Sequence, residues 1–331
     1  MASSTPTLQS RWFWMRFTTA FAAASAILWA LEHGWEADFY KFDTIMHHPG
    51  TAEAAFGYRL MLPSLAVLLQ RMVPSLTDHN CFIATQILAI AVTVYLCGEW
   101  AAQFLPKMGR EFGYILSALM ISQTIDYWTF YDIAIVAFWT ACLLLLYRGK
   151  LWLYLAVLTA GTFNHENTLL LIPCALLYLW PTMKRSRFFL FAAAQIAAWC
   201  AVRFLVVHYT PSGPIFANHF WDNVHFWRFY WKRQSIFLNA IGYIPWWVLA
   251  ALGWRRSPRF LRCVAFSLPE LIVITFIFGK FNEARQFVAF IPGCIGLIAC
   301  LVCDRLGLPL PQDGRGSAPA AAALQPRQAT T

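Results

Sequence analysis

The chain has 331 residues, of which 59% are hydrophobic and 12% charged, and its formal net charge is +9. Soluble domains average about 45–50% apolar and about 25% charged residues, so this composition excludes an ordinary water-soluble domain. It predicts an all-α, polytopic transmembrane helical bundle. The basic residues are spread over short loops between apolar segments, so the positive charge does not indicate nucleic-acid binding.

About ten apolar segments are predicted to span the membrane, with only short polar breaks between them. In chain order they are Phe13–Leu31, Cys81–Leu105, Phe112–Thr124, Ile133–Tyr147, Leu151–Phe163, Thr168–Trp180, Phe188–Val207, Ile236–Leu252, Val264–Phe278 and Phe287–Cys303. They predict one integral membrane domain over residues 13–303, after a short N-terminus of residues 1–12. The tail, residues 304–331, is rich in Pro, Ala and Gly and is predicted to be disordered. The first segment also resembles a signal peptide, but Arg16 interrupts it, which favours a retained helix.

The distribution of Lys and Arg predicts which helix ends face the cytoplasm. Basic residues gather in alternate breaks, and the positive-inside rule places these breaks, together with Arg11 and Arg16, in the cytoplasm. These basic breaks between the spans contain Lys107 and Arg110, Arg148 and Lys150, Lys184 to Arg187, and Arg255 to Arg262. The alternation holds only if the apolar stretch Phe56–Pro74 does not cross the membrane and lies near the outer interface. Both termini are then cytoplasmic in a multi-pass protein of the cell (inner) membrane, and residues 32–80 form an outer loop with a non-crossing helix.

Under this topology several polar stretches share the outer side, among them Asn164-His165-Glu166-Asn167 in the middle of an apolar run. The two flanking spans have about 17 residues each and rise about 25 Å, less than the roughly 30 Å thickness of the hydrocarbon core. Polar groups at that depth are typical of a protein-enclosed or water-filled cavity. The alternative is a hairpin tip with asparagine caps at the level of the headgroups.

Two acidic residues of the first outer loop, Glu36 and Asp38, are candidates for chemistry. Carboxylates two residues apart can act as a general base and its partner, or can coordinate a divalent cation as cofactor. The alternative is a solvated acidic loop. The adjacent His47 and His48 lack the spacing of metal ligands, so the sequence assigns no residue as a metal ligand.

Three basic residues on the outer side, Arg59, Lys280 and Arg285, are candidates for binding phosphate. A guanidinium group can hold a phosphate with two hydrogen bonds, but it can also simply extend to the membrane surface. Lys280 and Arg285 flank Glu283, and a surface ion pair is the alternative for that turn. Glu270 lies inside an apolar span, where an ionisable residue suggests function by default, although pairing with a neighbouring helix also explains it.

Short motifs resemble the GT-C superfamily of integral membrane glycosyltransferases, in particular its small bacterial members. They are Glu36-Ala37-Asp38, the non-crossing helix, and the stretches YRLMLP (58–63), FYD (130–132), NHEN (164–167) and NEAR (282–285). The resemblance covers residues 10–305 and implies sugar transfer from a polyprenyl-phosphate donor to an acceptor at the extracytoplasmic face, in synthesis of the cell envelope. The spacing of the acids and the absence of a soluble outer domain depart from the pattern, which leaves the base and acceptor recognition open.

The resemblance also implies roles for individual residues. Asp38 would be the catalytic base, with Glu36 as its alternate. The residues expected to bind substrate are Tyr58, Arg59, Asp132, Asn164, His165, Glu166, Lys280, Glu283 and Arg285. A transporter or flippase of lipid-linked sugars, a polysaccharide polymerase and a non-catalytic membrane scaffold are the alternative functions. A transporter would need polar groups through the middle of the bilayer, whereas most of these candidates lie at one face.

Overall fold

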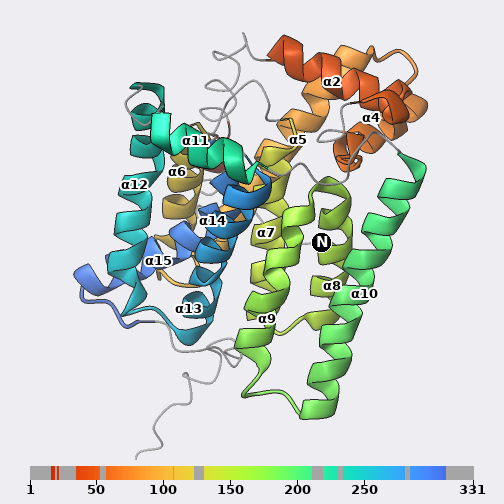
Figure 1. Ribbon diagram of the computed structural model, residues 1–331. Coiled ribbons are helices and arrows are strands. Elements are labelled where there is room, and N and C mark those ends of the chain that lie inside the picture. Colours follow the sequence, from red (N-terminus) through yellow and green to blue (C-terminus); the bar gives the residue numbers. More distant parts are fainter. Residues whose placement is uncertain are drawn as a thin grey trace, which may run out of the picture.

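The computed structural model describes residues 16–18, 21, 35–52, 57–106, 108–122, 130–210, 219–229, 234–279 and 284–310. All regular elements in this part of the chain are helical, so the expected all-α fold is confirmed (Figure 1). The α-helices are α2 (Trp35–His47), α4 (Met61–Met72), α5 (Asp78–Ala101), α6 (Gly109–Ser122), α7 (Asp132–Tyr147), α8 (Leu151–Asn164), α9 (Leu171–Leu179), α10 (Arg185–Tyr209), α11 (Phe220–Phe229), α12 (Gln234–Trp254), α13 (Arg259–Ala265), α14 (Ser267–Phe278) and α15 (Ile291–Arg305). Three short 3₁₀ helices accompany them: η2 (Pro49–Thr51), η3 (Glu166–Leu170) and η4 (Ala284–Phe290).

Four helices among the described residues are long and apolar enough to cross a membrane. They are Asp78–Ala101, Arg185–Tyr209, Arg259–Phe278 and Gln286–Arg305. The expectation of ten spans is therefore corrected to four helices of full length, which are consistent with a multi-pass membrane protein. Several expected spans became helices that are too short, because α6 has 14 residues and α9 has 9. At 1.5 Å per residue these rise about 21 Å and about 14 Å, less than a hydrocarbon core of roughly 30 Å.

Two expectations concern residues that the structure describes only slightly or not at all. Most of the expected first span, Phe13–Leu31, lies outside the described residues, as does most of the C-terminal tail, from residue 311 onward.

The surface of α10 is suited to contact with lipid. Leu190 and Phe204 are both 70% exposed on this helix, whereas the polar Gln195 and Arg203 are 0% and 7% exposed. A helix on the surface of a water-soluble protein has the reverse arrangement, with its polar face outward. The apolar outer face and the polar inner face of α10 therefore support its assignment as a membrane-spanning helix.

One end of the helical bundle holds the NHEN turn and the starts of α5 and α7. The Gln86 side chain, in the first third of α5, donates a hydrogen bond to the carbonyl of Phe130, just before α7. The Asn164 side chain at the end of α8 donates to the next carbonyl, that of Tyr131. We call this end the η3 end, after the 3₁₀ helix that follows α8 (Figure 1).

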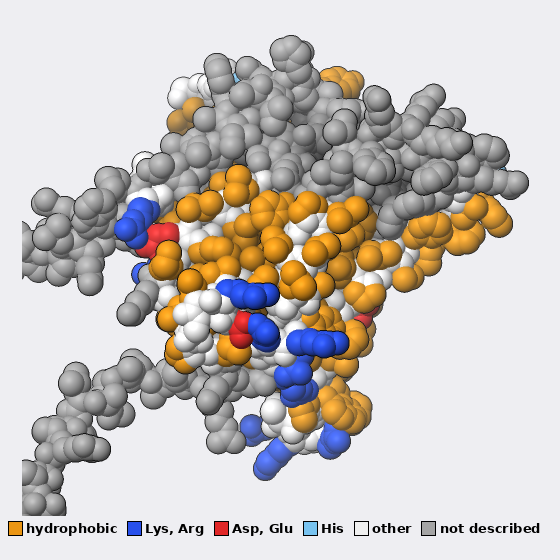
Figure 2. Space-filling model, turned by 90° about the vertical axis from the view of Figure 1, so that its left-hand side faces the viewer, with side chains coloured by type: hydrophobic (Ala, Val, Ile, Leu, Met, Phe, Trp, Pro, Cys, Tyr) orange, Lys and Arg blue, Asp and Glu red, His pale blue; other side chains and the backbone are white. Residues whose placement is uncertain are grey.

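The opposite end of the bundle carries the basic loops. Arg110 and Arg148 both contact Glu99, at N···O distances of 2.6 Å and 3.5 Å, near the end of α5. Arg16 pairs with Glu111 at the start of α6, so this part of the N-terminal segment lies at the same end. Figure 2 shows Lys and Arg gathered below a broad hydrophobic area on the α12 and α15 side of the molecule. This segregation agrees with the charge pattern from which the topology was predicted.

The segment expected not to cross the membrane begins and ends at the η3 end. His47, the last residue of α2, lies 3.2 Å from Asp78, the first residue of α5. Residues 48–77 therefore leave and return at one end, and α4 within them has only 12 residues.

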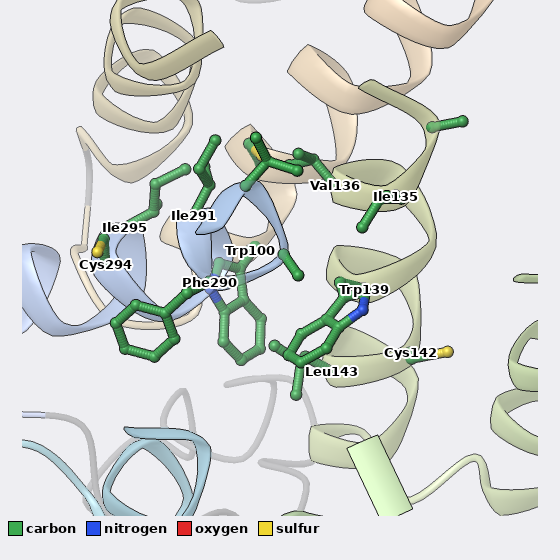
Figure 3. Close-up of a cluster of buried hydrophobic side chains, with 14 of the residues drawn as sticks. Trp100, Ile135, Val136, Trp139, Cys142, Leu143, Phe290, Ile291, Cys294 and Ile295 are labelled. Carbon is green, nitrogen blue, oxygen red and sulfur yellow. The ribbon is translucent and has the colours of Figure 1, made fainter. Parts of the chain in front are cut away.

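A core of large side chains joins α5, α7 and the η4–α15 segment (Figure 3). Trp100 and Trp139 are 0% and 1% exposed, and Phe290 packs beside Trp100. The indole N–H of Trp100 donates to the carbonyl of Pro292 at 2.8 Å, which satisfies a polar group that would otherwise be buried without a partner. Their packing holds the helices that support the η3 end.

Candidate functional site

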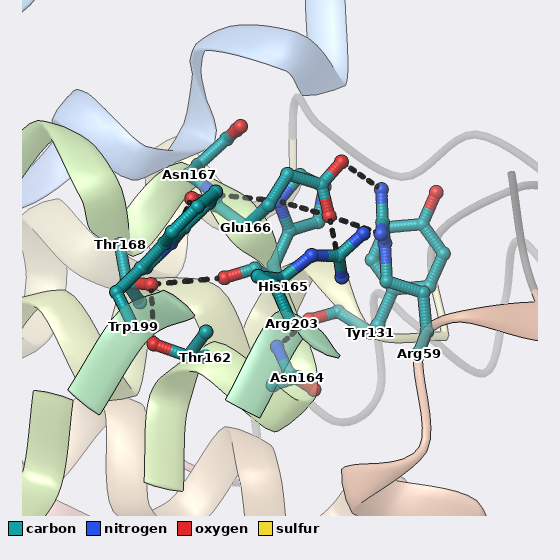
Figure 4. A network of polar contacts seen from close by, with 10 residues as sticks. All are labelled: Arg59, Tyr131, Thr162, Asn164, His165, Glu166, Asn167, Thr168, Trp199 and Arg203. Atoms are coloured by element: carbon teal, nitrogen blue, oxygen red, sulfur yellow. Dashed lines mark hydrogen bonds and ion pairs between the residues drawn. The ribbon is translucent and has the colours of Figure 1, made fainter. Parts of the chain in front are cut away.

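The NHEN turn uses most of its polar groups to hold its own shape. His165 has an extended backbone (φ −160°, ψ 139°), and its Nδ1 accepts a hydrogen bond from the backbone N–H of Asn167 at 3.1 Å, so it caps η3. Asn164 is only 1% exposed and donates to the Tyr131 carbonyl at 3.1 Å. The alternative interpretation of the sequence was a hairpin tip with asparagine caps. In the structure the cap of η3 is a histidine, His165. The Glu166 side chain points across to Arg59 and Arg203 (Figure 4).

Glu166 forms a bidentate ion pair with Arg59. Nη2 of Arg59 donates to Oε1 of Glu166 at 2.7 Å, and Nη1 donates to Oε2. The backbone N–H of Leu60 donates to the carbonyl of Phe163 at 3.1 Å and so fixes the arginine segment against the end of α8. Two parallel hydrogen bonds between a planar guanidinium and a carboxylate are among the strongest polar contacts in proteins.

A second arginine, Arg203 on α10, faces the same carboxylate. Its Nη1 lies 3.6 Å from Oε2 of Glu166, which is an ion-pair contact longer than a hydrogen bond. One helical turn earlier on α10, the Trp199 indole N–H donates to the Glu166 carbonyl at 3.2 Å. Arg203 is not among the site residues predicted from the sequence. The signal was present, because Arg203 is a charged residue inside the apolar segment Phe188–Val207, and the rule that selected Glu270 selects it too.

Aromatic rings lie against both arginines. The Cζ atom of Arg59 is 5.2 Å from the centroid of the Tyr131 ring, and that of Arg203 is 5.4 Å from the Tyr58 ring. Such cation–π contacts stabilise a guanidinium group that has been removed from water. They also explain how two arginines that are each 7% exposed can share one site.

The site carries more positive than negative charge. Among the described residues it contains the guanidinium groups of Arg59 and Arg203 and the carboxylate of Glu166. Within the described residues, Nε of Arg59 and Nη1 of Arg203 are buried and have no hydrogen-bond partner. Buried donors nearly always have a hydrogen-bond partner, so two buried cationic donors that lack one, although Nη1 of Arg203 lies within ion-pair distance of Glu166, are what a site for an anion would provide.

The pKa of the Glu166 carboxyl group is lowered, although partial burial of the group opposes ionisation. Burial alone would raise the pKa of this carboxyl group, but its electrostatic interactions with Arg59, His165 and Arg203 outweigh burial, and the pKa lies well below its usual range. Glu166 is therefore ionised at neutral pH. A carboxylate with a lowered pKa that is paired with two arginines is a weak proton acceptor.

This lowered pKa predicts a loss of stability in acid. The stabilisation is complete above the pKa of an unfolded glutamate, about 4.3, and is lost as the pH falls towards the lower folded-state pKa. The difference in unfolding free energy between the wild type and Glu166→Gln is therefore expected to narrow by about 1.4 kcal/mol per pH unit below about pH 4.3. Denaturation of both proteins in detergent, at a series of pH values between 7 and 3, measures this difference in unfolding free energy. A difference that stays constant down to pH 3 contradicts the low pKa.

The other expected site residues are placed as follows. Asp132, which is 3% exposed, begins α7 beside Tyr131 and acts electrostatically on Tyr243 of α12. Glu36 and Asp38 lie on α2, but their side chains are outside the described part of the chain, as are all of Lys280 and Glu283 and the side chain of Arg285. Of the expected substrate-binding residues, the structure brings five together: Tyr58, Arg59, Asn164, His165 and Glu166.

Comparison with protein-family models, curated proteins and solved structures gives no match for this chain. The function of the cluster therefore has to be inferred from its own chemistry.

Proposed function

We propose that the chain is an integral membrane glycosyltransferase of the GT-C type, which transfers a sugar from a polyprenyl-phosphate donor at the extracytoplasmic face of the cell (inner) membrane. The observation that carries this proposal is that, in the described part of the chain, the positive charges of both Arg59 and Arg203 face one carboxylate, that of Glu166. Two arginines at one site suit the oxygens of a phosphate, because each guanidinium presents a planar fork of N–H donors.

The position of the cluster supports a phosphate that is attached to lipid. Arg203 faces the interior of the bundle, while the next residue, Phe204, is 70% exposed on the apolar outer face of α10. A lipid phosphate beside α10 can place its charged group at the arginines while its hydrocarbon chain stays in the bilayer. A water-soluble phosphate would gain nothing from the apolar outer face of α10.

The charges of the loops support an outward-facing position for the η3 end. Arg110 and Arg148 lie at the end of the bundle opposite the arginine–glutamate cluster, and the positive-inside rule places such loops in the cytoplasm. The η3 end then faces outward, where polyprenyl-phosphate sugars serve as donors for enzymes of the proposed type.

The proposed reaction is a displacement at the anomeric carbon of the donor sugar. The acceptor hydroxyl group gives its proton to Asp38, or to Glu36 as the alternate base, while its oxygen forms the new glycosidic bond. The bond from the anomeric carbon to the phosphate oxygen breaks, and the electron pair leaves with the lipid phosphate. Arg59 and Arg203, together with Lys280 and Arg285, would stabilise the negative charge on that phosphate.

An assay of sugar transfer tests this function directly. In liposomes with polyprenyl-phosphate sugars and isolated envelope acceptors, the wild type is expected to transfer sugar, and Asp38→Asn to do so about 10²–10⁴-fold more slowly because the base is lost. Asp222→Asn is the matched control, since Asp222 is exposed on α11 and pairs only with the nearby His219 among the contacts described.

Two outcomes would contradict the proposal. Unchanged transfer by the double variant Glu36→Gln/Asp38→Asn would remove the assigned base. Movement of the intact lipid-linked sugar across the bilayer without any transfer would instead identify a flippase.

A further inference from the structure

A second polar cluster lies at the η3 end, away from the arginines. Nε2 of His47 is 3.7 Å from Oδ1 of Asp43 and 3.2 Å from Oδ2 of Asp78. One ligand atom from each of the three residues lies within 4.8 Å of the other two. We propose that Asp43, His47 and Asp78 bind a divalent transition-metal ion.

The spacing of the three ligand atoms suits such an ion. Zinc and similar ions bind imidazole nitrogen and carboxylate oxygen at about 2.0–2.2 Å, so ligands of one ion lie roughly 3–3.6 Å apart. Asp43 and His47 stand four residues apart on α2 and therefore share one face of that helix. The third ligand, Asp78, is the first residue of α5 and lies 31 positions after His47 in the chain. The local spacing of residues in the sequence therefore does not predict Asp78 as a ligand.

Asp78 is held in the orientation that a ligand needs. The first residues of a helix often carry a carboxylate as a cap, but the cap of α5 is Thr77, whose side chain accepts a hydrogen bond from the backbone N–H of Asn80 at 3.2 Å. Instead, Gln70 of α4 donates to Oδ1 of Asp78 at 2.6 Å and leaves Oδ2 directed towards His47. Metal-binding carboxylates are commonly fixed by such outer hydrogen bonds.

The ligand set indicates which ion is bound. One imidazole nitrogen with two carboxylate oxygens suits Zn²⁺ or Mn²⁺, whereas Ca²⁺ and Mg²⁺ prefer oxygen ligands alone. The side chains of His47, Asp43 and Asp78 are 42%, 38% and 35% exposed, so water can complete the coordination. The ion would tie the end of α2 to the start of α5 and so fix α2, the helix that carries Glu36 and Asp38. The site stands independently of sugar transfer, because metal binding can be measured without it.

Direct titration of the full chain tests this site. The purified protein in detergent, freed of metal with a chelator, is expected to bind one Mn²⁺ per chain by electron paramagnetic resonance and one Zn²⁺ by competition with a chromogenic chelator. Both His47→Ala and Asp43→Asn should weaken binding at least 10-fold, and Gln70→Ala about 10-fold through the lost outer hydrogen bond. His48→Ala is the matched control, because this adjacent imidazole lies outside the three-residue cluster.

A second readout separates binding from a failure to fold. Added Zn²⁺ should raise the melting temperature of the wild type and of His48→Ala, but not that of His47→Ala, whose helical content is checked by circular dichroism. Absence of saturable binding to the wild type up to millimolar metal would overturn the proposal. So would equal loss of binding in His47→Ala and His48→Ala, or no loss in either.

Discussion

Replacement of Glu166, whose side chain is 29% exposed, by glutamine is expected to destabilise the protein by at most about 3–5 kcal/mol, the cost of removing one partner from a fully buried ion pair. The reason lies in the balance of charge, since Arg59 and Arg203 would remain as two like charges, each only 7% exposed. Glutamine keeps the size of the side chain but accepts hydrogen bonds with one oxygen only. Reversible unfolding of the purified protein in mixed detergent micelles measures the change.

A double-mutant cycle identifies the source of this loss. The double variant Arg59→Gln/Glu166→Gln should be less destabilised than the sum of its single variants, because it removes the charge that Glu166→Gln leaves unpaired. The control is Asp304→Asn, which breaks a pair with the half-exposed Arg256 at the opposite end of the bundle. That pair should contribute less than about 1 kcal/mol. Equal effects of Glu166→Gln and Asp304→Asn would contradict a buried, charged site.

The helices could be predicted from the sequence because an apolar run is a local property. The expected spans Cys81–Leu105 and Phe188–Val207 correspond to α5 (Asp78–Ala101) and α10 (Arg185–Tyr209) to within a few residues. The number of full-length spans could not be predicted, because composition does not show where a helix ends. Residues 166–179, for example, divide into η3 and the nine-residue α9.

The site could be predicted only in part, because it depends on contacts between distant segments. The charge pattern placed Arg59 and Glu166 on one side of the membrane, but nothing in the sequence shows that these residues, 107 positions apart, pair with each other. Arg203 is visible in the sequence as a charged residue inside an apolar run, but the run does not show which side chain it faces. The spacing of His47 to His48 does not suit a metal, and the sequence does not show that the structural neighbour of His47 is Asp78.

Arg203→Gln is expected to lower kcat/KM for sugar transfer by about 10²–10³-fold, the usual cost of removing one donor that stabilises charge in a transition state. Arg203→Lys should recover only part of the activity, because lysine keeps the charge but lacks the planar fork of donors. Arg187→Gln is the matched control, since Arg187 is an exposed arginine near the other end of the same helix. Its transfer rate should equal that of the wild type.

Stability distinguishes a role in anion binding from a structural role of Arg203. Glu166 keeps its bidentate partner Arg59 in the Arg203→Gln variant, and the substitution removes a buried Nη1 that has no hydrogen-bond partner in the described part of the chain. The free energy of unfolding should therefore change by less than about 1 kcal/mol, far less than for Glu166→Gln. If Arg203 serves only to neutralise Glu166, its loss will lower stability and activity together, and the affinity for polyprenyl phosphate without a sugar will not change. If it binds the phosphate, that affinity falls while stability is preserved.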